Sequence, residues 1–257
     1  MNILFIGDIV SNQGCDYLSD VLPKLKIEYK ADIVVANGEN SAKGNGVTPQ
    51  SAKMIFDSGV DVITLGNHAL RRPEIADYLE RNEFILRPEN YHKSAPGRGI
   101  TVLDKGRCQV LVANLQGTMY LDNNENPFDA ADRIVGYAEE NGIKTVLIDF
   151  HAETTSEKRA LGFYLDGRIS ALVGTHTHVQ TSDEQILPCG TAYITDLGMT
   201  GAYYSVLGVE PEIVIKKFRT NLPVRFTSAD GPCTIEGCFV QTNDKTGRAE
   251  KIERFRR

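Results

Sequence analysis

Short runs of Ile, Val and Leu alternate along this chain with longer segments whose apolar residues have helical spacing. This alternation is typical of α/β folds, in which helices connect neighbouring strands of a largely parallel sheet. The sequence predicts strands at Ile3–Gly7, Ile33–Asn37, Val62–Leu65, Cys108–Asn114, Thr145–Phe150, Ala171–Thr175 and Ala192–Thr195. It predicts helices at Asp16–Tyr29, Pro49–Asp57, Pro73–Glu80, Phe128–Glu140, Thr155–Tyr164 and Glu212–Phe218.

The C-terminal part of the chain has a different pattern. Turn signals at Asp230-Gly231 and Thr246-Gly247 separate alternating runs such as Thr234–Thr242, which indicates antiparallel strands that close the fold. No low-complexity linker or internal repeat interrupts the sequence. We therefore expect a single domain over residues 1–257, a length that one hydrophobic core can support.

Charge and composition exclude several classes of function. A net charge of -6 argues against a stable complex with long nucleic acid, and the short basic end, Lys251–Arg257, is expected to be a solvated terminus. No apolar run approaches the roughly 20 residues of a membrane span, and the first residues lack a basic signal-peptide region. The five cysteines form no Cys-x-x-Cys pair. These features predict a cytoplasmic protein with reduced thiols and no membrane association.

Polar residues of the types that bind metals follow five of the predicted strands. Because the carboxyl ends of parallel strands meet at one edge of a sheet, the loops there form the usual ligand site. A lone Asp after a strand is more often a turn or helix cap, and a lone His is usually only hydrogen bonded. Together, however, the five motifs contain four of the five histidines and favour a metal site. They are Gly7-Asp8, Gly38-Glu39-Asn40, Gly66-Asn67-His68, Asp149-Phe150-His151 and Gly174-Thr175-His176-Thr177-His178.

The types of ligand indicate both the metal and the chemistry. His176 and His178 are two apart, so in an extended chain they would face the same way and reach one or two adjacent ions. Oxygen and imidazole ligands without cysteine suit Fe, Mn or Zn. Two such ions, bridged by one carboxylate, would supply a metal-bound hydroxide for in-line attack on phosphorus. His68 directly follows a candidate ligand and can point away from the ions, so it is the natural general acid.

The series of motifs resembles the calcineurin-like metallophosphoesterase superfamily. More narrowly, it resembles the bacterial YmdB-like family, whose members are described as metal-dependent phosphodiesterases of cyclic nucleotides, including 2',3'-cyclic AMP. The resemblance extends over nearly the whole chain, because segments outside the candidate ligands are similar too. These segments are Asn114–Gly117, Asp149–Lys158, Ala192–Asp196 and Asn221–Phe226.

This resemblance implies a double β-sheet sandwich flanked by helices (αββα), with a dinuclear metal site at the carboxyl ends of the strands. It implies two divalent or trivalent ions per subunit, with Fe favoured and Mn or Zn as alternatives. The ligands of the first ion would be Asp8, Glu39, Asn40 and His178. The ligands of the second would be Glu39, Asn67, His151 and His176. Glu39 would bridge the ions and His68 would donate the proton.

The sequence departs from the superfamily pattern at three places. The first motif normally reads Asp-x-His, whereas Asp8 is followed by Ile9-Val10, and the bridging residue is normally Asp rather than Glu39. In the narrower family, the Glu bridge and the neighbouring Asn compensate. The acidic residue that commonly follows Asn-His is replaced by Ala69. An orienting partner for His68 must therefore come from elsewhere.

A further departure concerns Ser11–Cys15, where the narrower family more usually has a glycine and an arginine. We expect Cys15 to be an ordinary buried thiol rather than a redox or substrate-binding residue. If the missing arginine steadies substrate phosphate, Arg71 and Arg72 are candidate replacements, although solvated side chains are the more ordinary interpretation.

The expected activity is hydrolysis of a small phosphodiester, most of all a cyclic nucleotide such as 2',3'-cyclic AMP, with His68 protonating the leaving oxygen. Two alternatives stay open: a broad phosphomonoesterase or nuclease that uses the same ions, and a nucleotide-binding regulator with little turnover. Substrate choice is expected in the loops, mainly Arg87–Gly99, Tyr120–Asp129 and Asp196–Leu207. A homo-oligomer is an open alternative that rests only on how common homo-oligomers are among soluble proteins.

Overall fold

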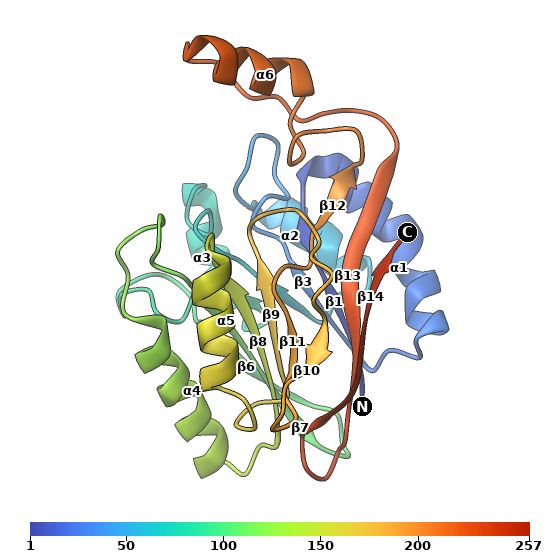
Figure 1. Cartoon of the computed structure of the whole chain (residues 1–257), viewed down its shortest axis with the longest axis vertical. Coiled ribbons are helices and arrows are strands. Elements are labelled where there is room, and N and C mark those ends of the chain that lie inside the picture. Colours follow the sequence, from blue (N-terminus) through green and yellow to red (C-terminus); the bar gives the residue numbers. More distant parts are fainter.

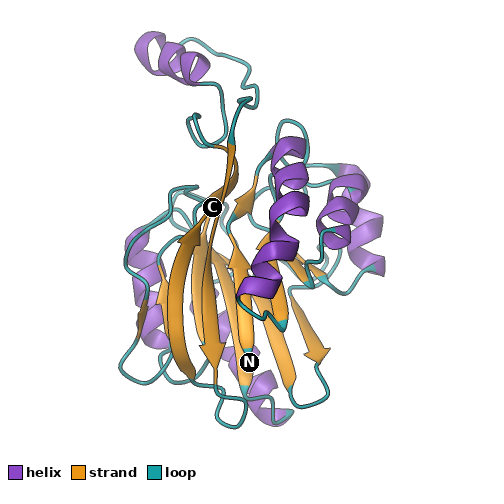
Figure 2. Cartoon of the chain, turned by 90° about the vertical axis from the view of Figure 1, so that its right-hand side faces the viewer, coloured by secondary structure: helices purple, strands orange, loops and turns teal.

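The computed structural model describes residues 1–257 as two β-sheets packed face to face, with helices on their outer faces (Figures 1 and 2). This arrangement confirms the predicted αββα sandwich. The eight-stranded sheet contains β1 (Asn2–Ile6), β2 (Asp8–Ile9), β3 (Ile33–Asn37), β4 (Val62–Thr64), β5 (Ile85–Leu86), β12 (Met199–Ala202), β13 (Cys233–Thr242) and β14 (Ala249–Arg256). The six-stranded sheet contains β6 (Ile100–Asp104), β7 (Gln109–Gln116), β8 (Thr145–His151), β9 (Ala171–Thr175), β10 (Gln185–Ile186) and β11 (Ala192–Ile194).

Most helices cover the two outer faces of the sandwich. They are α1 (Ser11–Glu28), α2 (Pro49–Asp57), a 3-10 turn at Pro73–Ile75 that leads into α3 (Ala76–Arg81), α4 (Pro127–Glu140), α5 (Thr155–Tyr164) and α6 (Pro211–Thr220). α1, α2 and α3 share a buried cluster with the eight-stranded sheet, and α4 and α5 share another with the six-stranded sheet. α6 stands apart from the body on the segment between β12 and β13 (Figure 1).

The alternation of side chains along the strands explains the layers. In β1, Leu4 packs toward the outer helices, whereas Ile3 and Phe5 join the cluster between the two sheets. Val112 of β7 and Val173 of β9 meet them there from the other sheet. Strands with apolar residues on both faces are buried on both sides, as expected where helices cover a largely parallel sheet.

The order of strands places the predicted site. β1, β3, β4 and β5 run parallel, as do β7, β8, β9 and β11. The carboxyl ends of β3, β4, β8 and β9 therefore lie at the same edge of the sandwich, which is the arrangement that the strand-end motifs predicted.

Among the predicted elements, only the start of α1 lies more than two residues from its prediction, and the C-terminal end is more ordered than expected. α1 begins at Ser11 rather than Asp16, so it includes Gly14. A Cβ at this glycine would meet the carbonyl oxygen of Thr200 at 2.5 Å, so this position of the helix packs directly against β12. Close packing of α1 on β12 thus outweighs the low helix propensity of glycine. Lys251–Arg257 keeps its basic side chains exposed, as expected of a solvated end, but nearly all of it is ordered as β14, which pairs antiparallel with β13 and buries Phe255. The predicted antiparallel strands of the C-terminal part are confirmed.

No helix of the chain combines the length and the hydrophobicity that a membrane span requires.

Candidate metal centre

A continuous network of contacts at the carboxyl ends of the strands joins all the residues predicted for the site. It links side chains that follow β1, β3, β4, β8 and β9, which are far apart in the sequence. The members of this network are Asp8, Glu39, Asn40, Asn67, His68, His151, His176 and His178.

Glu39 lies at the centre of this network and is 1% exposed. Its Oε1 lies 3.2 Å from His151 Nε2 and 3.3 Å from His68 Nδ1, and it accepts a hydrogen bond from Asn40 Nδ2 at 3.1 Å. Burial would raise the pKa of Glu39, but the attraction of His151 and His68 outweighs it, and the pKa is lowered well below its usual value. The carboxyl group is therefore an anion in a buried position.

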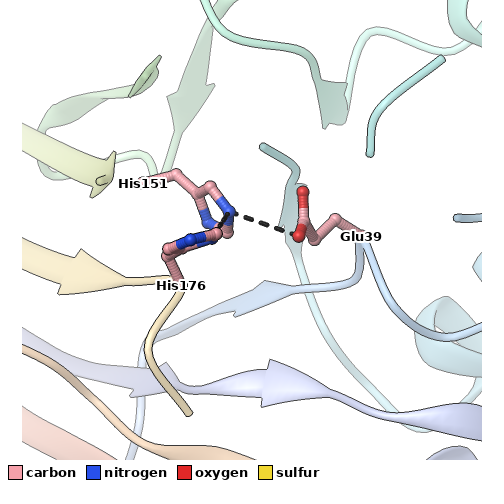
Figure 3. A group of neighbouring side chains, drawn as sticks. All are labelled: Glu39, His151 and His176. Carbon is pink, nitrogen blue, oxygen red and sulfur yellow. Dashed lines mark hydrogen bonds and ion pairs between the residues drawn. The ribbon is translucent and has the colours of Figure 1, made fainter. Parts of the chain in front are cut away.

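Glu39, His151 and His176 form a cluster of ligand type, with ligand atoms that all lie within 4.8 Å of one another. Figure 3 shows the two imidazole rings facing the Glu39 carboxylate. His176 Nδ1 lies 3.0 Å from His151 Nε2, and Asn67 Oδ1 lies 3.1 Å from the same nitrogen. Imidazole nitrogens and oxygens that converge in this way fit a borderline divalent or trivalent cation.

A second cluster lies beside the first and contains Asp8, Asn40 and His178. His178 Nε2 lies 3.5 Å from Asp8 Oδ1 and 3.3 Å from Asn40 Nδ2. Asp8 is fully buried, its Oδ2 accepts from the His176 N–H at 3.1 Å, and its Oδ1 has no hydrogen-bond donor. A buried carboxylate oxygen without a donor is costly, and a cation at this place would remove that cost. The donor set of this cluster therefore also fits a metal ion.

The loop that carries His176 and His178 is strained rather than extended. His176 has a φ of 104° and His178 a φ of 61°, so the expectation of two residues facing the same way along a strand is wrong. Both rings reach the site because the backbone bends after β9. The buried pair of Lys158 Nζ and Asp196 Oδ2, 2.7 Å apart, holds this bend, since the same Oδ2 accepts from the Thr177 N–H at 3.1 Å. Such strain persists only where the surroundings fix it, and it is frequent at functional sites.

His151 is oriented by buried groups that the sequence analysis did not select. Thr175 Oγ1 donates to Asp149 Oδ1 at 2.7 Å and lies 2.9 Å from His151 Nδ1. Because the hydroxyl hydrogen is used toward Asp149, the Thr175 oxygen accepts from the Nδ1–H, so Nε2 faces Glu39 and is the nitrogen that would bind a metal ion once it loses its proton. Burial raises the pKa of Asp149 to about 6. In the sequence, the only indication of Asp149 and Thr175 was their position inside the strand-end motifs.

The orienting partner of His68 comes from the candidate ligands themselves. His68 Nδ1 lies 3.0 Å from Asn40 Oδ1 and 3.3 Å from Glu39 Oε1, so this nitrogen faces the site rather than away from it. The side chain is nevertheless 27% exposed and lines the cavity beside the site. His68 thus connects the buried ligands to the space where a substrate would lie.

Glu153 is a further residue that the sequence analysis missed. Its Oε2 lies 2.9 Å from His176 Nε2, and both residues line the cavity. Since His176 Nδ1 faces His151, Glu153 fixes the opposite edge of this ring. In the sequence, the only indication of Glu153 was its position in Asp149–Lys158, one of the segments on which the family resemblance rests.

The cavity beside these clusters has a volume of about 350 Å³. Apart from the candidate ligands and His68, its lining consists of Val10, Ala42, Gly44, Asn45, Glu153, Thr177 and residues 207–209 and 226–228. Of the loops predicted to select the substrate, only Leu207 from Asp196–Leu207 lines this cavity, whereas Arg87–Gly99 and Tyr120–Asp129 contribute to a different one. The role of these loops in substrate choice stays a prediction, and the order of strands decides which of them reaches this cavity.

The arginines and the cysteine near the site have structural roles. Arg72 Nε donates to the carbonyl oxygen of Asn45 at 3.1 Å and so supports the loop at 42–45, whereas Arg71 is exposed and does not line the cavity. Cys15 is buried, and burial raises the pKa of its thiol to about 12, as expected for an inert thiol. Ser11 has a φ of 64°, a left-handed conformation that favours glycine.

The chain is similar to several known proteins over its whole length. The chain is 48% identical to the 2',3'-cyclic-nucleotide 2'-phosphodiesterase of Bacillus subtilis (strain 168), over 99% of this chain and 96% of that protein. A crystal structure of a Thermus thermophilus protein superposes with a TM-score of 0.93 at 40% identity, covering 100% of this chain and 99% of that one. A phosphatase of Mycoplasma pneumoniae superposes with a TM-score of 0.93 at 31% identity, covering 100% and 93%.

A more distant structure shares the fold alone. A 5'-nucleotidase precursor from Thermus thermophilus superposes with a TM-score of 0.59 at 12% identity, and the match covers 100% of this chain and 54% of that one. The family profile described as YmdB-like protein matches residues 4–255. Since this match spans nearly the whole sequence, the chain belongs to the YmdB-like protein family.

Proposed function

We propose that this protein is a metal-dependent phosphodiesterase of small phosphodiesters, most of all cyclic nucleotides such as 2',3'-cyclic AMP. The observation that carries the proposal is the buried Glu39 carboxylate, which lies between two clusters of metal-ligand type. The 48% identity to a Bacillus subtilis 2',3'-cyclic-nucleotide 2'-phosphodiesterase supports this substrate class.

The proposed site holds two ions, with Glu39 as the shared ligand. The donors are nitrogen and oxygen without thiolate and suit Fe, Mn or Zn, and the family resemblance makes Fe the favoured choice. Bound there, the ions supply positive charge for the phosphoryl oxygens and lower the pKa of a water molecule. The first set of ligands is Asp8, Glu39, Asn40 and His178. The second set is Glu39, Asn67, His151 and His176.

His68 is the proposed proton donor. Asn40 Oδ1 is an acceptor, so its 3.0 Å contact places a hydrogen on His68 Nδ1. The proton to be transferred is therefore the one on Nε2 of the imidazolium ion, and this nitrogen makes no hydrogen bond within the chain. Protonation of the departing ribose oxygen prevents the formation of an unstable alkoxide.

The cavity supports a nucleoside ester in preference to a bare phosphate. Its volume of about 350 Å³ lies within the range of roughly 300 to 1,000 Å³ that is usual for small-molecule sites. Val10, Leu207, Val209 and Phe226 give it apolar surface near the charged ligands. Phe226 is 46% exposed, which leaves an aromatic face available to a base.

A substrate panel on the metal-loaded protein tests this proposal. We expect 2',3'-cyclic AMP to be converted to 3'-AMP faster than p-nitrophenyl phosphate or single-stranded RNA is hydrolysed. Faster release of p-nitrophenol would instead identify a phosphomonoesterase, and rapid RNA cleavage a nuclease. Tight binding of the cyclic nucleotide without product would identify a regulator.

We also propose that residues 1–257 form one metallophosphoesterase domain. In support, β1 pairs with β13, and the Met1 amino group lies 2.6 Å from the Thr242 carbonyl oxygen and 2.7 Å from Asp244 Oδ1. A cytoplasmic location is part of the proposal, and it is supported by five unpaired cysteines, which are usual in a reducing compartment.

A further inference from the structure

A second cavity, of about 640 Å³, lies apart from the candidate metal centre. Its walls are residues 87–93, which follow β5, and residues 123–125 together with Arg133 of α4. These segments lie at the left of Figure 1, in teal and green. Tyr91 is the only hydrophobic residue in the lining, so the cavity suits a polar ligand.

Arg87 gives the main reason to expect an anion in this cavity. Its side chain is only 7% exposed, its NH1 donates to the Pro88 carbonyl oxygen at 2.8 Å, and its Nε has no acceptor. The Glu89 carboxylate lies 3.8 Å from NH1 and already accepts from the Gly99 N–H at 3.0 Å. A buried guanidinium nitrogen without an acceptor is costly, and an anion in the cavity would supply one for Nε.

The other charged residues leave a positive excess at this place. Arg133 is satisfied by Glu125, which it contacts through both NH1 and NH2 at 2.5 and 2.8 Å. Asn124 Nδ2, in contrast, is buried and has no acceptor. Lys93 is exposed and adds another cation to the lining. Two buried donors without acceptors thus line the same cavity, and its arginines and lysine outnumber its carboxylates by three to two.

We propose that this cavity binds a phosphate monoester of nucleotide size, whose phosphate oxygens accept from Arg87 and Asn124. A phosphate group offers several strong acceptors and matches the planar fork of a guanidinium group. The inference deepens the proposed function and rests on it, because hydrolysis of a cyclic nucleotide yields a ligand of this class.

The cavity is connected to the candidate metal centre through Tyr91. Its hydroxyl lies 3.1 Å from the Gly66 carbonyl oxygen and 2.9 Å from Gln116 Oε1. Gly66 directly precedes Asn67 and His68 in the chain. A ligand that contacts Tyr91 therefore acts on the segment that carries two site residues. Binding at this cavity is expected to lower kcat, whereas binding at the ions raises KM, so Arg87→Met should lose only the effect of the monoester on kcat.

Calorimetric titration of 3'-AMP into the metal-loaded protein tests the inference. Parent protein is expected to bind at two sites, one at the ions and one at the second cavity. Arg87→Met and Asn124→Asp should each weaken the second site about tenfold or more, the usual effect of losing a charge-assisted hydrogen bond. Arg98→Met is the matched control, because Arg98 is an exposed arginine that does not line the cavity. Adenosine, which has no phosphate, should not bind at the second site.

The same stoichiometry and Kd in Arg87→Met, Asn124→Asp and parent protein would overturn the inference, as would equal affinity for adenosine. If thermal unfolding shows that Arg87→Met does not fold, binding of 3'-AMP is measured with the isosteric Asn124→Asp and the exposed Lys93→Ala instead. Weaker binding at the second site then supports the inference, and unchanged binding overturns it. Binding is measured without turnover. A protein that binds 3'-AMP through Arg87 but hydrolyses no cyclic nucleotide would therefore contradict the proposed function and leave the cavity's role intact.

Discussion

The candidate metal centre has a buried side and an open side, and His151 and His68 represent them. His151 is fully buried within β8, and its orientation is fixed through Thr175 to Asp149. His68 follows β4, is 27% exposed and has only Asn40 and Glu39 as side-chain partners. Both rings face the Glu39 carboxylate, but only the His151 ring is held in a fixed orientation by buried neighbours.

This difference separates two tasks within one site. Groups that hold a metal ion benefit from a geometry that is fixed before the ion binds, which the packed strand ends supply. A group that transfers a proton has to reach the substrate, so it lies at the cavity. The comparison predicts that changes on the buried side reduce metal affinity, whereas changes on the open side reduce turnover.

The largest effect is expected where the two sides meet, at Glu39. Glu39→Ala should remove the shared ligand, release both ions and lower turnover by about 10⁴-fold or more, because the positive charge at the phosphoryl group is lost. Elemental analysis together with turnover of 2',3'-cyclic AMP checks this. Full metal occupancy in the variant would exclude a bridging role. Glu74→Ala serves as the control, since Glu74 is an exposed carboxylate that lines neither cavity.

A change on the open side should separate metal binding from catalysis. His68→Ala is expected to keep its metal content and to lose turnover by roughly 10²- to 10⁴-fold, the usual range for removal of a general acid. Esters with a p-nitrophenolate leaving group should be much less affected, because this group departs without a proton.

The control for His68 is His92→Ala, which changes the one histidine outside the metal centre; because His92 lines the second cavity, initial rates are compared without added monoester. An equal loss of rate for good and poor leaving groups in His68→Ala would contradict the role as proton donor, and so would unchanged rates.

A change on the buried side should act on affinity instead. Thr175→Val keeps the volume of the side chain but removes the acceptor for His151 Nδ1 and the donor for Asp149. Metal affinity is expected to fall by about 10- to 100-fold, as is usual when an outer-shell partner is lost, with turnover largely recovered at saturating metal. Thr101→Val, at another buried threonine, is the control. A loss of kcat at full occupancy would argue against this division of tasks.

Per pH unit, the smallest expected effect is a dependence of metal affinity on pH. Burial lowers the pKa of His151, but Glu39 outweighs it and the net pKa is raised to about 9 in the ion-free chain. Below that pH an ion must displace a proton from this ring, so apparent affinity should fall about tenfold per pH unit. Titrations against a chelator between pH 7 and 9 measure this slope. An affinity that stays constant over this range would contradict it.

The same raised pKa has a consequence for the ion-free fold. Since His151 binds its proton more tightly in the folded chain than when unfolded, its contribution to stability is complete below about pH 6.5. That contribution is lost as the pH rises through about 9.

Much of the site was predictable because its residues follow strands. Glu39, Asn67 and His151 each come at or directly after a strand end, and parallel strands deliver such residues to one edge whatever the details of packing. Their roles as ligands, and that of His68 as proton donor, stay predictions. Asn37 shows what was not predictable: it is a residue of β3 whose Nδ2 donates to Asp149 of the opposite sheet at 3.0 Å. Nothing local in its sequence indicates that contact.

By itself, the sequence determined the alternation of strands and helices and the chemical types gathered at the strand ends, because both follow from local periodicity and residue identity. Only the tertiary structure decided that Glu153 fixes His176, that the backbone bends after β9, and that residues 207–209 rather than 87–99 line the cavity. These features depend on contacts between segments distant in the chain, which the order of strands and the packing of the two sheets create.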